Sequence, residues 1–197
     1  RFRERFARPI ERDRDPARSA ALSALVRPFL LRRTKRNVAP ELPARTETVR
    51  FVELSPKERE LYEAERLTAL VSVGEADPRQ GRFAMLAALT RLRRLACHPR
   101  LLEAGSSVPS AKLASFLELS AELLAAGHRA LVFSQFTSHL ALVRAELDAR
   151  DVRYLYLDGD TPSAERQRLV AAFQAGEGDL FLLSLKAGGT GINLTGA

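Results

Sequence analysis

A glycine-rich segment at residues 184–194 is the part of this chain whose residue types best suit chemistry: three of the four residues 188–191 are glycine, and Lys186 lies beside them. The segment follows the apolar run 180–183, which is typical of a buried strand. Glycine lets backbone N–H groups approach a phosphate without a Cβ atom in the way. A hydroxyl and a lysine beside such a turn suit a phosphate-bearing ligand at the carboxyl edge of a parallel sheet. A tight turn without a ligand is the alternative, because a short glycine cluster alone is weakly specific.

The composition is that of a globular chain with enough apolar material for a core, since 46% of its 197 residues are hydrophobic. No apolar run reaches the ~18 residues of a membrane-spanning helix, and the first residues lack the apolar segment of a signal peptide. We therefore expect no membrane partner. The single cysteine, Cys97, excludes an internal disulfide and cannot alone form a cysteine-based zinc site. We expect a buried thiol there, no metal site, and a reducing intracellular compartment.

Positive charge is concentrated at the start of the chain. Residues 1–50 carry fourteen Arg and Lys against six Asp and Glu, whereas residues 51–197 carry seventeen against eighteen. The densest cluster includes Arg32, Arg33 and Lys35. Such a cluster can neutralise nucleic-acid phosphates, but it can equally be a solvated helix end. Charge alone leaves both interpretations open.

Residues 1–105 are predicted to be mainly helical, with one strand at 46–54, where β-branched and aromatic residues alternate with polar ones. Ser55 and Glu58 form the start pattern of a helix, a capping serine with a glutamate three residues later. A second helix is predicted at 83–96. Its residues Met85, Leu86, Leu89, Leu92 and Leu95 are expected to face inward, and Arg91, Arg93 and Arg94 to form a solvated face.

The second half of the chain, after a linker at 104–109, shows regular alternation of helix and strand. This βαβαβ pattern predicts a parallel sheet with helices on both faces. The predicted strands are 130–133, 152–157 and 180–183, and the predicted helices are 110–126, 138–150 and one that opens at 161–164. Because the chain stops directly after the glycine turn, we expect further strands of this domain beyond residue 197.

Several segments match one known family in their order and spacing. In the first half these are 26–35, 42–47, 54–56, the ELYE at 60–63 and the LACHP at 95–99. In the second half they are LVFSQF at 131–136, LDG at 157–159 with Arg166, and the glycine segment 184–194. Together they resemble the helicase-like ATPases of the Swi/Snf class, which translocate on double-stranded DNA and remodel or evict bound proteins. The LACHP segment lacks the residue that many members have between Cys and His.

The resemblance implies an α/β fold whose second motor lobe is a RecA-like parallel sheet with flanking helices, here incomplete at its C-terminus. Residues 1–105 would be the end of the first motor lobe with a helical protrusion, and residues 106–197 most of the second lobe. In this family the strand ends of the second lobe face the cleft that holds DNA and ATP.

The resemblance also implies which residues make contacts. The implied DNA-binding residues are Ser134, Gln135, Asp158, Gly159, Arg166, Ser184, Lys186, Arg32, Arg33 and Lys35. The implied nucleotide-binding residues are Gly188, Gly189, Gly191 and Asn193. Local structure is the alternative for several of them: Ser134, Gln135 and Asp158 can cap turns, and Arg166 can be an ordinary surface charge on its helix.

Catalytic residues are expected to lie outside these 197 residues. No segment fits the phosphate-cradling pattern G-x-x-x-x-G-K-[ST], and no Asp-Glu pair follows a strand as a magnesium-binding segment would. The family carries both upstream, in the first lobe, and its cleft-facing arginine downstream. ATP and Mg²⁺ would thus be cofactors of a complete two-lobed protein, and this chain alone is not expected to hydrolyse ATP.

The implied partners are double-stranded DNA, the first motor lobe of the same polypeptide, and DNA-bound proteins such as polymerase or nucleoprotein complexes. The implied location is the bacterial cytoplasm with its nucleoid, or the nucleus of a eukaryotic source. Two other functions remain open: a non-catalytic, helicase-derived module that binds DNA or protein, and a nucleotide- or methyl-donor-binding α/β enzyme. The last leaves LVFSQF and the arginine-rich segment unexplained.

Overall fold

The computed structural model describes residues 1–31, 33, 38, 46–75, 77, 81–188, 192 and 194–197. They fall into two compact units, Arg1–Val49 and Arg50–Ala197, each described here by itself. Among these residues, none of the helices combines the length and the apolar character that crossing a membrane requires.

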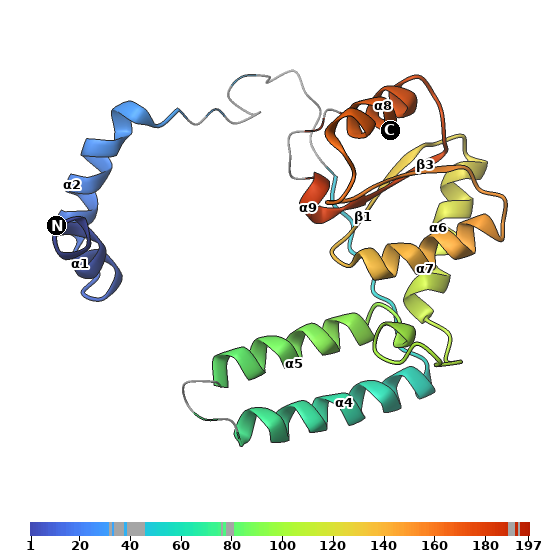
Figure 1. Ribbon diagram of the computed structural model, residues 1–197, viewed down its shortest axis with the longest axis horizontal. Coiled ribbons are helices and arrows are strands. Elements are labelled where there is room, and N and C mark those ends of the chain that lie inside the picture. The colour runs from blue at the N-terminus through green and yellow to red at the C-terminus, as the bar shows by residue number, and fades with distance from the viewer. Residues whose placement is uncertain are drawn as a thin grey trace. The chain divides into compact units, whose positions relative to one another are not determined.

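The first unit consists of short helices: a π-helical turn at Arg3–Ala7, α1 at Arg8–Glu11, α2 at Pro16–Val26 and a 3₁₀ turn at Arg27–Phe29 (Figure 1). Asp15 caps α2, because its Oδ1 accepts hydrogen bonds from the backbone N–H groups of Ala17 and Arg18 at 2.9 and 3.1 Å. The α-helix ends at Val26, and the chain continues into the 3₁₀ turn that contains Pro28, whose nitrogen has no N–H to extend the α-helical hydrogen bonds.

The second unit begins with an antiparallel pair of helices, α4 at Pro56–Gly74 and α5 at Gly81–Leu95 (Figure 1). The predicted start of α4 is confirmed: Ser55 Oγ accepts from the Glu58 N–H at 3.3 Å, and Glu58 Oε2 accepts from the Ser55 N–H at 2.9 Å. Arg91 on α5 pairs with Glu65 on α4, its Nη2 lying 2.9 Å from Oε2. Apolar contact and this ion pair hold the two helices together.

Two predictions for this region are wrong. Residues 46–54 are not in a strand, because the described chain offers them no partner strand and an isolated strand leaves its backbone groups unpaired. Met85, Leu86 and Leu89 do not face inward; 51%, 62% and 50% of their surface is exposed. The face of α5 that carries them meets no third element in the described residues, so the apolar residues that the pair of helices buries are mainly Ala69, Ala88 and Leu95.

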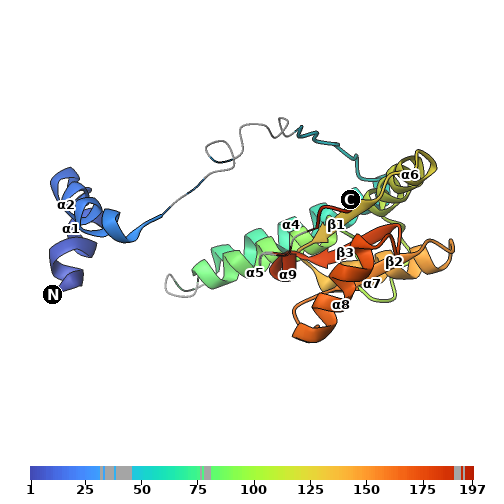
Figure 2. The ribbon, with the colours of Figure 1, turned by 90° about the horizontal axis from the view of Figure 1, so that it is seen from above.

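The rest of the second unit is a three-layer α/β structure. After a 3₁₀ turn at Pro99–Leu101, its elements are α6 (Ala111–Ala125), β1 (Ala130–Ser134), α7 (Thr137–Asp148), β2 (Tyr154–Leu157), α8 (Ser163–Gln174), β3 (Leu180–Ser184) and α9 (Leu185–Gly188). The strands are parallel, with β3 between β1 and β2 (Figure 2). The predicted parallel sheet, and its order of elements, is therefore confirmed.

The core of this sheet is organised by β3, whose residues are all buried. Leu180 and Leu182 point to one face, where they pack with Leu113 of α6 and with residues of α7. Phe181 and Leu183 point to the other face, toward α8 and α9. This alternation follows from the two-residue period of a strand, and it places α7 and α8 on opposite faces of the sheet, as Figure 1 shows.

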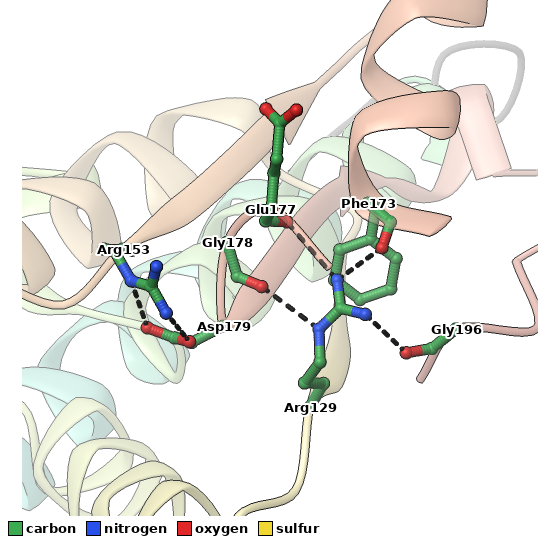
Figure 3. A network of polar contacts seen from close by, with 7 residues as sticks. All are labelled: Arg129, Arg153, Phe173, Glu177, Gly178, Asp179 and Gly196. Atoms are coloured by element: carbon green, nitrogen blue, oxygen red, sulfur yellow. Dashed lines mark hydrogen bonds and ion pairs between the residues drawn. The ribbon is translucent and has the colours of Figure 1, made fainter. Parts of the chain in front are cut away.

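Arg129, directly before β1, joins three segments at the amino-terminal edge of the sheet (Figure 3). Its Nε donates to the carbonyl of Gly178 at 3.2 Å, its Nη1 to that of Gly196 at 2.9 Å and its Nη2 to that of Phe173 at 2.5 Å. The guanidinium also lies over the Phe173 ring, with Cζ 4.0 Å from the ring centroid. The end of α8, the turn before β3 and the segment at Gly196 are thus fixed to one side chain.

Candidate nucleic-acid interface

The carboxyl ends of the three strands meet along one edge of the sheet, here called the carboxyl edge: Ser134, Asp158 and Ser184 with the residues directly after each. The register pairs Ser134 with Ser184, and Leu157 with Leu183. Asp158, the residue after Leu157, therefore comes next to Ser184 on the side away from Ser134. The structure thus brings together the three strand ends from which the sequence motifs come, and parallel α/β sheets bind ligands at this edge.

At the end of β1, the hydroxyl of Ser134 is used locally. It accepts from the Phe136 N–H at 3.2 Å and lies 3.3 Å from the Phe136 carbonyl, to which it donates. Gln135 is exposed, and its Oε1 accepts a hydrogen bond from Nη2 of Arg93, a residue of the last turn of α5. The Arg93 guanidinium also lies 5.9 Å from the ring centroid of Phe136. The end of α5 therefore belongs to this part of the edge.

At the end of β2, Asp158 organises a turn. Its carboxylate accepts from the Tyr156 hydroxyl at 2.7 Å and from the N–H of Asp160 at 3.0 Å. The hydrogen bond from Tyr156 lowers the pKa of Asp158, while burial, followed by that bond, raises the pKa of Tyr156 to about 12. Asp158 is therefore ionised and Tyr156 neutral at neutral pH.

Arg166 holds the same turn from α8. Its Nε donates to the carbonyl of Thr161 at 2.8 Å, and its Nη2 donates to those of Asp158 and Gly159 at 3.0 and 2.9 Å. An arginine with three carbonyl acceptors shapes the backbone around it. A direct DNA contact by Arg166, Asp158 or Gly159 stays a prediction.

At the end of β3, Ser184 is 3% exposed, and its Oγ accepts from the Ala187 N–H at 3.3 Å, which starts the short helix α9. Lys186 is exposed beside it. Gly188 lies against Phe133: a Cβ added there would come within 2.7 Å of the Phe133 Cε1 atom. Any larger residue at this position would have to displace the Phe133 ring, a close contact that the sequence pattern did not reveal.

Several predicted site residues cannot be placed at this edge. Gly189, Gly191 and Asn193 lie outside the described residues, as do Arg32 and Lys35. Arg33 is described and exposed, and it belongs to the first unit.

A cavity of about 440 Å³ opens beside the end of β1 and contains residues that the sequence did not suggest as site residues. Its polar lining includes Arg93, Lys112, Ser134, Gln135 and His139. Burial, followed by the charge of Lys112, lowers the pKa of His139 to about 4, so its imidazole is neutral at neutral pH. In the described part of the chain, Nε2 of His139 is buried without a hydrogen-bond partner. The charge run in α5 was the one sequence feature that could have drawn attention to Arg93.

Comparison with known proteins agrees with this architecture. Residues 1–101 match the family model for the SNF2-related domain, and residues 111–197 match that for the helicase conserved C-terminal domain. The protein YwqA of Bacillus subtilis (strain 168) is 37% identical over 213 aligned positions that cover 100% of this chain and 22% of YwqA.

Solved structures show the same fold. The SWI2/SNF2 ATPase core domain of Sulfolobus solfataricus superposes with a TM-score of 0.73 at 30% identity, covering 100% of this chain and 42% of that one. The same core in complex with double-stranded DNA gives a TM-score of 0.67 at 27% identity, covering 93% and 40%. The chain therefore spans under half of each of these three proteins.

The strand order, the motifs at the carboxyl edge and the two adjoining family matches lead to one assignment. This chain belongs to the Swi/Snf class of helicase-like proteins, with a SNF2-related domain followed by a RecA-like helicase C-terminal domain.

Proposed function

We propose that this chain is part of an ATP-dependent motor that moves along double-stranded DNA, and that its carboxyl edge contacts the phosphate backbone. The observation that carries the proposal is the convergence of the three strand ends, with Gln135 and Lys186 exposed on that edge. A similar solved core is in complex with double-stranded DNA. Contacts with phosphates position a protein without reading sequence, which suits a motor that must move along any DNA.

Hydrolysis of ATP belongs, in this proposal, to a larger two-lobed protein. The chain lacks the glycine-lysine loop that cradles nucleotide phosphates. Mg²⁺ in such a site is held by one or two carboxylates together with the nucleotide phosphates, so a complete site would also need the phosphate-binding loop that this sequence does not contain. We expect the purified 197 residues to show no DNA-stimulated release of phosphate from ATP, and a measurable rate would contradict this assignment.

Replacing Lys186 with alanine is expected to weaken salt-dependent DNA binding. Each phosphate that a lysine neutralises contributes about 0.9 to the slope of log affinity against log salt concentration on duplex DNA. Titration of a mixed-sequence duplex at several salt concentrations should therefore show a slope that is smaller by about one unit in Lys186→Ala.

The matched control is Lys57→Ala, which removes an exposed lysine from the first turn of α4. Its slope should equal that of the unchanged chain. Equal slopes for both variants would remove Lys186 from the interface, and a chain that binds duplex without any dependence on salt would contradict the proposed function.

A further inference from the structure

We propose that Arg93 is a positioning residue for DNA binding: it holds the Gln135 amide so that the NH₂ group, and not the oxygen, faces a backbone phosphate. This inference rests on the proposed function. The hydrogen bond between Arg93 and Gln135 joins two residues that are 42 positions apart in the sequence. Arg93 lies at the end of α5, and Gln135 lies directly after β1. Figure 1 shows that the last turn of α5 comes close to the start of α7, where this contact is made.

The orientation of the amide follows from the chemistry of its partner. A guanidinium has five N–H donors and no acceptor. Arg93 can therefore bind only the oxygen of Gln135, as the structure shows. Both N–H bonds of the amide are then left for other acceptors. Phosphate oxygens are acceptors, so a Gln135 that is fixed in this way is matched to a phosphate.

Two other polar side chains of this cavity are less available to a ligand. The hydroxyl of Ser134 bonds to the backbone of Phe136, and the imidazole of His139 is half-buried. The exposed amide of Gln135, directly after β1, is able to donate outward.

The charge around this amide favours an anion. Lys112, in the first turn of α6, lines the same cavity as Gln135 and Arg93. Among the described residues Lys112 has no ion-pair partner, and it is exposed. Two cations and an outward-facing amide, with no carboxylate in the lining of the cavity, form a surface for an acceptor-rich, negatively charged group. The backbone of duplex DNA is the ligand of that kind that the proposed function supplies.

The decisive variant is Gln135→Glu, because it separates orientation from packing. A glutamate keeps an oxygen for Arg93 and strengthens that contact by its charge, but it presents a second oxygen where the NH₂ group was. If Gln135 only fastens α5 to the sheet, DNA affinity should stay close to that of the unchanged chain. On our inference the affinity for a mixed-sequence duplex falls about tenfold or more, since a donor is lost and a negative charge faces the phosphate.

The matched control is Gln167→Glu, the same substitution at an exposed position of α8. It measures the general effect of one added negative charge on DNA binding. The loss of DNA affinity in Gln135→Glu should be severalfold larger than the loss of DNA affinity in Gln167→Glu. Equal losses of affinity would overturn the inference.

A double-mutant cycle tests whether Arg93 acts through Gln135. Arg93→Ala and Gln135→Ala should each weaken binding by about three- to tenfold, which is the effect of one hydrogen bond. The double variant should be no weaker than the weaker single variant, because both changes remove the same contact. Losses that multiply would show that Arg93 meets DNA independently of Gln135 and would overturn its positioning role.

Two further variants serve as controls for the double-mutant cycle. Arg91→Ala removes another exposed arginine of α5, which pairs with Glu65 and not with Gln135, and it should leave DNA affinity unchanged. Arg93→Lys retains a donor and should recover part of the affinity lost in Arg93→Ala. Circular dichroism of every variant shows whether it is folded.

Failure of this inference is distinguishable from failure of the proposed function. If the unchanged chain binds duplex in a salt-dependent manner and Lys186→Ala flattens the slope, but the Arg93 and Gln135 variants bind like their controls, only the inference is wrong. If the unchanged chain does not bind duplex at all, the proposed function is wrong and the inference falls with it.

Discussion

Replacing Glu58 with alanine should lower the free energy of unfolding by about 2–4 kcal/mol, because two backbone N–H groups lose their acceptor and each unsatisfied buried donor costs about 1–3 kcal/mol. Glu58 is 3% exposed. Its Oε2 accepts from the Ser55 N–H at 2.9 Å, and its Oε1 accepts from the Ala111 N–H at 3.0 Å. One carboxyl group therefore caps both α4 and α6. Urea unfolding followed by circular dichroism measures the loss.

Two controls define this effect. Glu58→Gln keeps one oxygen, so it should cost about half as much as Glu58→Ala. Glu60→Ala removes an exposed glutamate from the same turn of α4, and it should change the stability by no more than about 0.5 kcal/mol. If Glu58→Ala and Glu60→Ala unfold at the same urea concentration, the bond between α4 and α6 contributes nothing to stability.

Replacing Arg129 with alanine is expected to cost about 2–4 kcal/mol and to release the segment at Gly196. Hydrogen bonds from a charged donor contribute about 1.5–3 kcal/mol, and here one guanidinium serves the carbonyls of Gly178, Gly196 and Phe173 (Figure 3). Its stacking on the Phe173 ring would also be lost. Urea unfolding gives the global effect, and faster amide exchange of residues 194–197 should report the local one.

Arg153 is the matched control at the same edge of the sheet, also visible in Figure 3. Its Nη2 lies 2.7 Å from Oδ1 of Asp179, but its side chain is 71% exposed. An exposed ion pair adds little to stability because water screens its charges, so Arg153→Ala should have a small effect. Arg129→Lys keeps the charge without the planar fork of donors and should restore only part of the stability. Equal costs for Arg129→Ala and Arg153→Ala would contradict the role assigned to Arg129.

Local features of this chain were predictable from the sequence because neighbours along the chain determine them. Ser55 and Glu58, three residues apart, predicted the start of α4 correctly, because their reciprocal hydrogen bonds depend only on this local spacing. The helix predicted at 110–126 is α6, and Gly127, with a φ of +76°, follows its end as glycines commonly do. The alternation of apolar runs with amphipathic helices predicted a parallel sheet, and with it the meeting of three strand ends.

Contacts between distant segments were not predictable in the same way. Nothing in the sequence pairs Arg93 with Gln135, since the order of residues does not show that the end of α5 lies at the end of β1. The close contact at Gly188 is made by the ring of Phe133, a residue on another strand. The exposed face of α5, with Leu86 and Leu89, was misjudged because an amphipathic pattern shows that a face is apolar but not which element covers it.

If the carboxyl edge of the sheet contacts the DNA backbone, as proposed, the backbone amides of that edge should respond to added DNA. Amide chemical-shift mapping of the ¹⁵N-labelled chain, titrated with a mixed-sequence duplex at low salt, tests this most directly. Shifts should concentrate at the carboxyl edge, including Gln135, Gly159 and Lys186, and should disappear as salt is raised. Residues of the amino-terminal edge, such as Arg153 and Asp179, should not respond. Shifts that concentrate at Arg153 and Asp179 and spare Gln135 and Lys186 would contradict the account.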